Sequence, residues 1–435
     1  MSQNSTNAAI LCFFQAAFGV LSRLMTRPKI LILGGGFGGV FTALELAGSA
    51  DITLVTDADH FLFTPMLYEY LSGEVEAWHI APSYDELLSD NVHCIQDAVT
   101  NIDLTAQTVS LANHGEALSY DMLVLALGGV TNYVGVEGAE EFSLPFRKLA
   151  HADELRRRMV TSLDRIPPQT APQDVRRDVT FAVVGAGASG CELSTKMADL
   201  LLDAFKRRAL HGEPRVLLLE MGDNVVPGMG EQIRVFVDDA LRQSHVEVHT
   251  QTRVVKLTGD EFTFEHQGNR ETLKTAGVVW TGGVKMNPVI EKLDVEKNKR
   301  GVLIVNPTLQ LPQHNNVFAL GDVAFYADAT PSLQGTAQLA FQQASLAARN
   351  VNAFLEGNEL HTRHFEELGE AISLGTERAA VLAGGKAFGG ALARQARFAL
   401  YTSRLPTWHH RLRVGASWFL GGTEPRPLLP LGLER

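Results

Sequence analysis

Short runs of successive apolar residues, each leading into a glycine-rich turn, recur along this chain. Lys29–Leu33 is one such run, and the segment that follows its turn, from Phe37 to about Ala47, predicts a helix. Apolar side chains in succession, without alternation, are typical of a parallel strand that is buried on both faces. Further strands are predicted at Asp51–Val55 and Tyr120–Ala126. The pattern therefore predicts a parallel sheet with helices on its faces.

The same order of elements is repeated further along the chain. It predicts a strand, a helix and two more strands at Thr180–Val184, Ser189–Arg207, Arg215–Leu219 and Gly277–Trp280. Residues 165–178 contain three prolines among charged residues, which predicts a surface loop. A strand at Asn316–Leu320 is interpreted as a return to the first unit. We therefore expect an α/β fold of two Rossmann-like dinucleotide-binding domains, the second inserted in the first.

Both units carry the pattern Gly-x-Gly-x-x-Gly directly after their first strand. The first turn contains Gly34, Gly36, Phe37, Gly38 and Gly39, and the second contains Gly185, Gly187, Ser189 and Gly190. Such a turn lets the backbone approach a pyrophosphate and directs helix N–H groups at it. A single motif is a weak signal, but two in strand–turn–helix context predict two dinucleotides. Two dinucleotides side by side suggest a flavin that is reduced by a nicotinamide.

Acidic residues follow some of the predicted strands. Glu220 ends a strand of the second unit, where a carboxylate binds both ribose hydroxyls and repels the 2′-phosphate of NADPH, which favours NADH. In the first unit Thr56 occupies this place and Asp57 follows it. Asp322 follows the last strand, where it either accepts a hydrogen bond from the ribityl chain of a flavin or caps a helix, the commoner role.

Composition narrows the function classes. The 435 residues suffice for two or three domains, and 45% hydrophobic with 20% charged residues is typical of a folded protein. A net charge of −11 argues against a nucleic-acid partner. The three cysteines, Cys12, Cys94 and Cys191, form no close pair, which argues against a redox dithiol and a structural metal site. We expect no metal and a reducing, cytosolic environment.

The N-terminal residues form a separate segment. Residues 8–21 are largely apolar, but Gln15 interrupts them. A signal peptide requires a positively charged segment before its apolar run, and no Lys or Arg precedes residue 8. The run is also shorter than the roughly 20 residues that span a bilayer. We expect residues 1–24 to be a disordered or misassigned extension, with Met25 as a natural start.

Several further motifs stand in a fixed order along the chain. They are residues 60–69 (His-Phe-Leu-Phe-Thr-Pro-Met-Leu-Tyr-Glu), 185–193, 280–284, 319–322 and 337–343 (Ala-Gln-Leu-Ala-Phe-Gln-Gln). With these motifs, the chain from about residue 28 to residue 381 resembles the type II NADH dehydrogenases. These are single-subunit, flavin-dependent NADH:quinone oxidoreductases attached to the membrane surface. The resemblance implies non-covalent FAD, NADH as substrate, and two-electron reduction of a membrane quinone without proton pumping.

The resemblance also implies site residues. Glu192 would orient NADH, and Gln338 with Gln342, one helical turn apart, would present amides to flavin and quinone, although such a pair is more often a solvated helix face. The residues implied to contact FAD are Gly34, Gly36, Phe37, Gly38, Gly39, Thr56, Asp57, Thr64, Pro65, Val99, Ala126, Gly128, Gly321, Asp322, Gln338, Leu339 and Ala340. Those implied to contact NADH are Gly185, Gly187, Ser189, Gly190, Glu192, Glu220, Gly282 and Gly283.

This chain departs from the family pattern at some positions. Phe341 stands where some members have His, Leu368 where many have Lys, and Gln343 where some have Glu. Residues 127–129 (Leu-Gly-Gly) replace the more usual Ala-Thr-Gly turn. The group that protonates the quinone is therefore left unassigned.

The C-terminal stretch differs in charge from the rest of this acidic chain. Residues 379–423 contain no Asp or Glu but carry Lys386, Arg394, Arg397, Arg404, Arg411 and Arg413 among Phe388, Phe398, Tyr401, Trp408, Trp418 and Phe419. This composition predicts an amphipathic helical region that lies on a membrane, where each cation adds about 1 kcal/mol of attraction. A dimer interface or a helix packed on the body is the alternative. We expect a peripheral protein on the cytoplasmic face of the cell membrane, and a homodimer is left open.

These patterns divide the chain into predicted domains. Residues 25–145 and 298–375 form the FAD-binding domain, 146–297 the NADH-binding domain and 376–435 the membrane-attachment region. The rival functions are a sulfide:quinone oxidoreductase or disulfide reductase, which needs reactive cysteines, a flavoprotein reductase with a soluble acceptor, and an NADH-sensing flavoprotein with little turnover.

Overall fold

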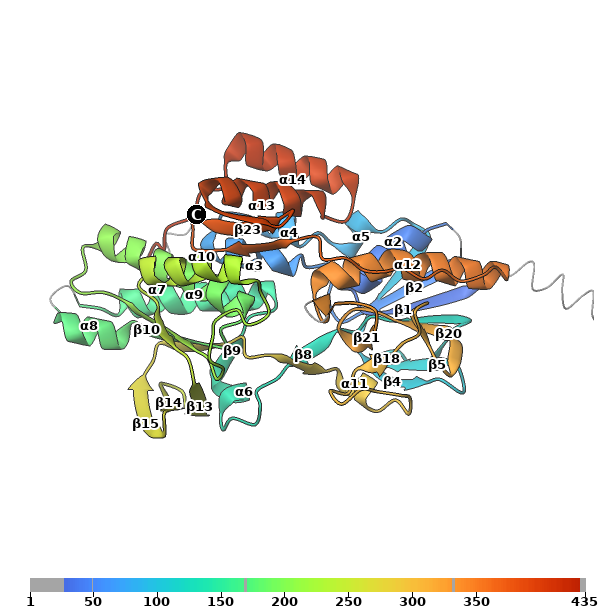
Figure 1. Cartoon of the computed structure of the whole chain (residues 1–435), viewed down its shortest axis with the longest axis horizontal. Coiled ribbons are helices and arrows are strands. Elements are labelled where there is room, and N and C mark those ends of the chain that lie inside the picture. The colour runs from blue at the N-terminus through green and yellow to red at the C-terminus, as the bar shows by residue number, and fades with distance from the viewer. Residues whose placement is uncertain (1–26, 49, 168–169, 331–332, 431–435) are drawn as a thin grey trace, which may run out of the picture.

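The computed structural model describes residues 27–48, 50–167, 170–330 and 333–430. The predicted extension at 1–24 lies outside these residues. Two mainly parallel sheets, each flanked by helices, lie side by side, and the C-terminal helices lie across one side of the pair (Figure 1). The expected α/β fold with two Rossmann-like domains is thereby confirmed.

The first sheet has the strand order β19-β20-β7-β1-β2-β3. The strands are β1 (Lys29–Leu33), β2 (Asp51–Thr56), β3 (Val92–Gln96), β7 (Met122–Leu125), β19 (Gln310–Leu311) and β20 (His314–Ala319). Strand β1 pairs in parallel with β2 and β7, and β20 pairs in parallel with β7. Helices α2 (Phe37–Leu46) and α12 (Ala337–Glu356) pack against each other beside it. The chain therefore returns to this sheet after completing the second one.

The second sheet has the order β12-β11-β10-β16-β9, with all neighbours parallel. Its strands are β9 (Ser143–Pro145), β10 (Thr180–Val184), β11 (Arg215–Leu219), β12 (Glu247–His249) and β16 (Gly277–Trp280). Helices α7 (Leu149–Asp164), α9 (Ala188–Arg208) and α10 (Glu231–Gln243) accompany them. Strand β9 joins this sheet although it precedes residue 146, and the domain boundaries otherwise stay a prediction.

Shorter elements complete the two domains. An antiparallel sheet of β13 (Thr252–Leu257), β14 (Glu261–His266) and β15 (Asn269–Lys274) extends the second domain. Strands β8 (Gly129–Thr131) and β17 (Val284–Met286) pair antiparallel where the chain passes between the domains (Figure 1). The remaining short elements are η1 (Thr64–Met66), α3 (Leu67–Ser72), α4 (Ala77–Ile80), α5 (Tyr84–Leu87), β4 (Val99–Asp103), β5 (Thr108–Leu111), β6 (Leu118–Ser119), α6 (Ala139–Phe142), α11 (Pro288–Glu291), β18 (Leu303–Ile304), η2 (Gly321–Val323) and β21 (Ala324–Phe325).

The prediction of a surface loop over residues 165–178 is wrong in its second half. Residues Pro172–Asp178 form helix α8, with Pro172 in the first turn. A proline lacks the N–H that a helix start leaves unpaired anyway, and its fixed φ suits the first helical position. Here the proline begins a helix instead of preventing one.

The C-terminal region consists of a small sheet and two helices. Strands β22 (Glu370–Ser373), β23 (Ala379–Ala383) and β24 (Lys386–Gly390) form an antiparallel sheet, followed by α13 (Ala391–Ser403) and α14 (Trp408–Gly421). In Figure 1 these two red helices lie over both domains. None of the helices in the described ranges is long and apolar enough to cross a membrane.

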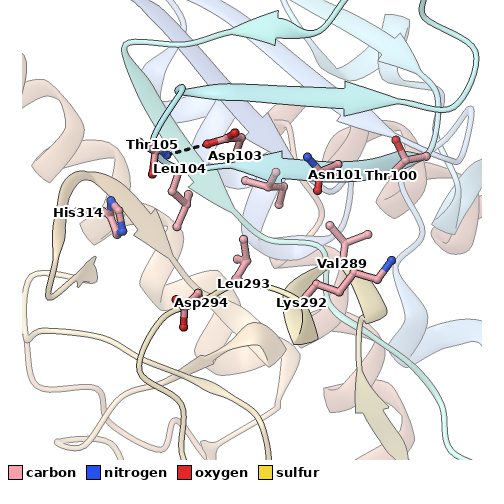
Figure 2. Close-up of a pocket in the computed structure, with 11 residues that line it drawn as sticks. Thr100, Asn101, Asp103, Leu104, Thr105, Val289, Lys292, Leu293, Asp294 and His314 are labelled. Atoms are coloured by element: carbon pink, nitrogen blue, oxygen red, sulfur yellow. Dashed lines mark hydrogen bonds between the residues drawn. The ribbon is translucent and has the colours of Figure 1, made fainter.

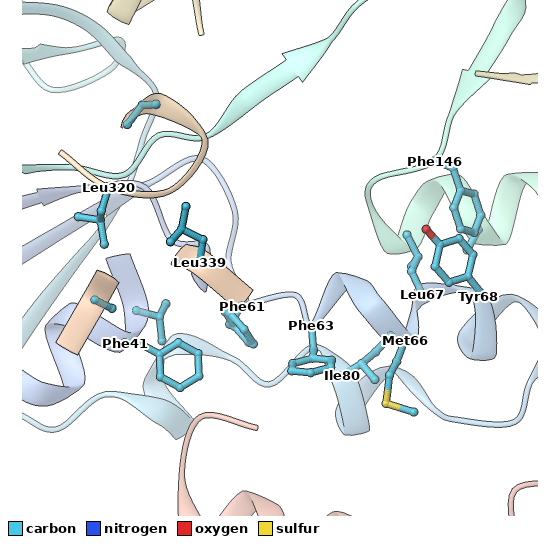
Figure 3. Close-up of a cluster of buried hydrophobic side chains, with 14 of the residues drawn as sticks. Phe41, Phe61, Phe63, Met66, Leu67, Tyr68, Ile80, Phe146, Leu320 and Leu339 are labelled. Atoms are coloured by element: carbon cyan, nitrogen blue, oxygen red, sulfur yellow. The ribbon is translucent and has the colours of Figure 1, made fainter. Parts of the chain in front are cut away.

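A band of apolar side chains connects the two domains. Figure 3 shows it running from Phe41 and Leu320, beside the first sheet, past Phe63 to Tyr68 and Phe146. The rings of Tyr68 and Phe146 stack with centroids 5.5 Å apart, and all five side chains are buried. The band packs η1 and α3 against the start of the second domain.

Candidate functional site

In the first glycine turn, the backbone geometry requires glycine at the outer positions, Gly34 and Gly39, but not at the middle position, Gly36. Gly34 has φ +112°, and a Cβ on Gly39 would lie 1.8 Å from the Gly34 carbonyl oxygen. Gly36, by contrast, has an extended backbone that any residue adopts, and a Cβ there would meet no atom within 4 Å. The open space next to Gly36 is the space into which a pyrophosphate fits.

The second turn repeats this geometry. Gly185 has φ +98°, and a Cβ on Gly190 would lie 1.8 Å from the Gly185 carbonyl oxygen, whereas a Cβ on Gly187 would meet nothing within 4 Å. A Cβ on Gly185 would be 2.7 Å from the Cα of Gly282, so the turn after β16 lies directly beside it. Packing explains the outer glycines of both turns, and room for a ligand explains the middle ones.

The helices that follow the two turns both begin without a cap. Neither α2 nor α9 has a side-chain hydrogen bond at its N-cap, and neither has an acidic residue in its first turn. Their first N–H groups and the positive end of each helix dipole therefore remain for an anion. Both turns fit the pyrophosphate of a dinucleotide on the geometry of this chain alone.

The residues predicted for FAD gather around the first turn. A Cβ on Gly38 would lie 3.3 Å from Ala126 Cβ, and a Cβ on Gly321 would lie 3.4 Å from Ala340 Cβ. Asp322, next to Gly321, is half-buried, makes no hydrogen bond among the described residues, and burial raises its pKa. A half-buried carboxylate without a partner is suited to accept a ligand hydroxyl.

Two residues that sequence reasoning did not select support this site. Gln343 is fully buried, and its Oε1 accepts the N–H of Gly321 at 2.8 Å, which holds the turn before Asp322. Tyr84, on α5, donates to the carbonyl of Gly35 at 3.0 Å. Gln343 reaches the site from α12 and Tyr84 from α5, so the supporting role of each residue follows from the tertiary fold.

The remaining predicted FAD residues lie at element ends. Thr56 ends β2, and its Oγ1 is 3.3 Å from the Tyr84 hydroxyl, whereas Asp57 is exposed and pairs with Lys148 at 3.5 Å. The other members lie at the start of β4, in the turn before β8, and in η1 and α12: Val99, Gly128, Thr64, Pro65, Gln338 and Leu339.

Glu220 lies beside the second turn, as expected from its place after β11. Its Oε2 accepts the N–H of Ala186 at 2.7 Å, and its Oε1 accepts the N–H of Gly222 at 2.7 Å. The carboxylate is thus oriented by the turn itself, and it is partly accessible to solvent. Gly283, also predicted for NADH, has φ +126° in the neighbouring turn.

Glu192 is buried on α9, five residues beyond Gly187. Its Oε1 accepts the N–H of Ser373 at 2.8 Å and a guanidinium N–H of Arg397 at 3.1 Å. Burial is the largest cause that raises the pKa of Glu192 to about 7, with Arg397 opposing and Glu69 adding to the shift. A carboxyl group with this pKa changes its protonation state near neutral pH.

Glu192 belongs to a buried ionic cluster that sequence reasoning missed. The cluster comprises Glu69, Glu74, Glu192, Lys196, Arg394 and Arg397. The interpretation of Arg394 and Arg397 as membrane-facing cations is therefore wrong, because both pair with internal carboxylates. Their partners lie 320 and 328 residues away in sequence, so no local pattern reveals them.

Gln338 and Gln342 both hold the segment before β22. Gln338 accepts the N–H of Leu368 at 3.0 Å and donates to the carbonyl of Gly369 at 3.2 Å, and Gln342 donates to the carbonyl of Glu366 at 3.0 Å. Phe341 lies between them in sequence, packs edge-on against Phe41 with centroids 4.7 Å apart, and lies beneath Arg404. The two amides thus form one wall with residues 366–369.

The cysteines in the described ranges do not form a redox pair. Cys94 and Cys191 are both free. Cys191 is buried with its Sγ 3.5 Å from the Ala186 carbonyl, and burial raises its pKa far above the usual value. A thiol in this state is a poor nucleophile, which argues against disulfide reductase and sulfide oxidation chemistry at this position.

A cavity of about 320 Å³ opens between β4 and α11 (Figure 2). Its walls include Thr100, Asp103, Lys292, Asp294 and His314, and none of the residues predicted for FAD or NADH lines it. It is therefore separate from the paired glycine turns.

Comparison with known proteins places the chain in a family. Residues 28–348 match the pyridine nucleotide-disulphide oxidoreductase family. The chain is 35% identical over 405 residues to demethylphylloquinone reductase NdbB of Synechocystis sp., covering 90% of this chain and 96% of that one. It is 30% identical over 411 residues to the type II NADH:quinone oxidoreductase NdhA of Mycobacterium tuberculosis, covering 90% and 86%. The solved structure of NDH2 from Plasmodium falciparum in complex with NADH shares the fold, with a TM-score of 0.82 at 19% identity over 93% of this chain and 100% of that one. The chain belongs to the pyridine nucleotide-disulphide oxidoreductase family and, within it, to the type II NADH:quinone oxidoreductases.

Proposed function

We propose that this protein oxidises NADH through bound FAD and reduces a membrane quinone by two electrons, without pumping protons. The observation that carries this proposal is the pair of glycine turns. Each has a middle glycine beside open space and each leads into an uncapped helix. The family relationship adds the electron acceptor, because the curated relatives are named for the reduction of quinones.

The flavin site is assigned to the first turn. A flavin held there would supply hydride acceptance from NADH and electron transfer to the acceptor. The chain contributes the N–H groups at the start of α2, the unpaired carboxylate of Asp322, and Gln343, which fixes the loop before Asp322. These groups bind and orient the cofactor.

The NADH site is assigned to the second turn. Glu220 is already oriented by two backbone N–H groups and is suited to accept the two ribose hydroxyls, while its charge disfavours the 2′-phosphate of NADPH. Glu192 has one oxygen held by Ser373 and Arg397, which leaves the other to contact NADH. Specificity for NADH therefore rests on Glu220.

The quinone site is assigned to the wall formed by Gln338, Gln342 and residues 366–369. Leu368 is half exposed in this wall, so an apolar surface adjoins the buried amide of Gln342 and the half-buried amide of Gln338. This combination suits a quinone, which has a flat apolar ring with two carbonyl acceptors. Phe341 and Leu368 stand where other members have His and Lys, so neither position supplies an ionisable side chain.

Attachment to the cytoplasmic membrane surface is assigned to α13 and α14. These helices expose large apolar side chains at Leu392, Leu400, Trp408, Leu412, Phe419 and Leu420. Exposed apolar residues grouped on neighbouring helices mark an interaction surface, and the quinone substrate favours a bilayer over a second copy of the chain.

The decisive experiment mixes purified protein with NADH and a short-chain, water-soluble quinone under anaerobic conditions. We expect the extracted cofactor to be FAD, its absorbance to bleach on addition of NADH, and the colour to return on addition of quinone. Bleaching without reoxidation by quinone would refute the acceptor, and absence of bleaching would refute the donor.

A further inference from the structure

An arginine from the C-terminal region lies between the two dinucleotide-binding domains. Arg397, on α13, is 1% exposed, and its guanidinium donates to three oxygens. They are Glu69 Oε1 at 2.7 Å, the carbonyl of Pro65 at 2.7 Å and Glu192 Oε1 at 3.1 Å. Pro65 and Glu69 belong to the segment assigned to the flavin side, whereas Glu192 lies on α9 beyond the NADH turn. One side chain therefore joins both sites.

The charges continue in alternation behind Arg397. Lys196 Nζ lies 3.5 Å from Glu69 Oε1 and also pairs with Glu74. Glu74 in turn accepts from Arg394 at 2.8 Å. The order along the cluster, alternating in sign at every step, is Arg394, Glu74, Lys196, Glu69, Arg397 and Glu192. Glu192 is the last member and lies nearest to the NADH turn in sequence.

The ionic cluster positions its carboxylates more than it stabilises the fold. Buried ion pairs often stabilise a fold no better than apolar side chains of the same volume. A guanidinium group, however, donates its hydrogen bonds only in defined directions, so its partners must lie at defined positions. Glu192 shows the result: Oε1 receives the hydrogen bonds of Arg397 and Ser373, and Oε2 makes none among the described residues.

We propose that Arg397 is a positioning residue for NADH oxidation: by holding Oε1 of Glu192 it leaves Oε2 available to NADH, and it fixes this carboxylate relative to Pro65 on the flavin side. The inference rests on the role assigned above to Glu192. Because Arg397 comes from α13, docking of that helix on the two domains completes the NADH site.

The test uses the FAD-loaded protein with Arg397→Met, which keeps an unbranched apolar side chain in place of the arginine stem but removes the charge and the donors. The first measurement is the dissociation constant of NAD⁺, from titration of the flavin fluorescence. The second is the pH dependence of the rate at which NADH bleaches the flavin, by stopped flow. We expect the dissociation constant to rise at least about tenfold. The pH midpoint moves upward, because the cation that opposes the raised pKa of Glu192 is gone.

Three further variants make the result interpretable. Arg397→Lys keeps the charge but not the fork, so we expect a pH midpoint like that of the wild type with weaker NAD⁺ binding. The double variant Glu69→Gln/Arg397→Met removes the carboxylate that Arg397→Met leaves unpaired, so it folds if the single variant does not, and it also binds NAD⁺ weakly. Arg207→Met is the matched control, because Arg207 is exposed on α9, the helix that carries Glu192. We expect it to leave both measurements unchanged.

Glu192→Gln, measured in parallel, separates the two proposals. If this variant keeps the wild-type NAD⁺ affinity and pH dependence, the role assigned to Glu192 is wrong. If Glu192→Gln weakens binding while Arg397→Met and the double variant change only the melting temperature, Arg397 is merely structural and the inference is overturned.

Discussion

At neutral pH the carboxyl group of Glu192 is divided between its two protonation states, because burial raises its pKa to about 7 from a reference value of 4.5. Between these two values the folded protein holds a proton that the unfolded chain has released. Raising the pH through this window therefore lowers the free energy of unfolding. Glu192 is thus kept at a cost to stability, which is typical of residues retained for function.

Glu192→Gln should remove this pH dependence, since an amide resembles the protonated carboxyl. We expect the variant to match the wild type at about pH 5 and to be more stable at about pH 8, by an amount on the order of 1–3 kcal/mol. Thermal melting at both pH values measures the difference, with the exposed Glu116→Gln as control. Equal melting temperatures of variant and wild type at about pH 8 would contradict the raised pKa.

Glu220 is the residue that we propose selects NADH over NADPH. Glu220→Gln keeps an acceptor oxygen for only one of the N–H groups of Ala186 and Gly222, and it loses the charge that binds ribose hydroxyls and repels a 2′-phosphate. We expect the KM for NADH to rise about 10- to 100-fold, because a hydrogen bond to a charged group contributes roughly 1.5–3 kcal/mol. We also expect the ratio of kcat/KM for NADH to kcat/KM for NADPH to fall in steady-state kinetics. The control Glu213→Gln, at an exposed position, should change neither this ratio nor the KM for NADH. A wild-type enzyme that uses NADPH as efficiently as NADH would refute this role.

At the scale of elements, the strand–turn–helix units were the most predictable part of the molecule. Strands β1 and β10 have the bounds that the sequence predicts, since a strand buried on both faces is a continuous apolar run with a glycine at its end. Helix α8 escaped prediction because proline marks both loops and helix starts. The ionic cluster around Arg397 escaped it because its partners come from α3, α9 and α13, which only the tertiary fold brings together.

The two glycine turns allow a matched pair of substitutions. Gly36→Ala and Gly187→Ala each add a methyl group into open space at an extended φ, so we expect stability of the cofactor-free protein to change by no more than about 0.5 kcal/mol. Gly36→Ala should lower FAD retention, measured as flavin per protein after gel filtration. Gly187→Ala should leave FAD bound and raise the KM for NADH. Each variant is the control for the other, and loss of FAD from Gly187→Ala would contradict the assignment of the turns.

At the scale of the whole molecule, the C-terminal region has two faces with different tasks. Its inner face carries Arg394 and Arg397 into the ionic cluster, and its outer face exposes apolar side chains. Deleting the region after Gly384 would therefore damage the NADH site together with any membrane contact. Substitutions confined to the outer face separate the two effects.

The end of α14 offers such positions, since Phe419 is 89% and Leu420 is 83% exposed. We expect Phe419→Glu/Leu420→Glu to abolish cosedimentation with anionic liposomes, because burial of two such side chains contributes roughly 3 kcal/mol or more, about a 100-fold change in binding. Turnover with a water-soluble quinone should be unchanged, as neither residue touches the cluster. Val235→Glu/Val248→Glu, at exposed apolar positions on the second domain, provides the control. Liposome binding that persists while a dimer dissociates into monomers would show instead that the outer face joins two copies of the chain.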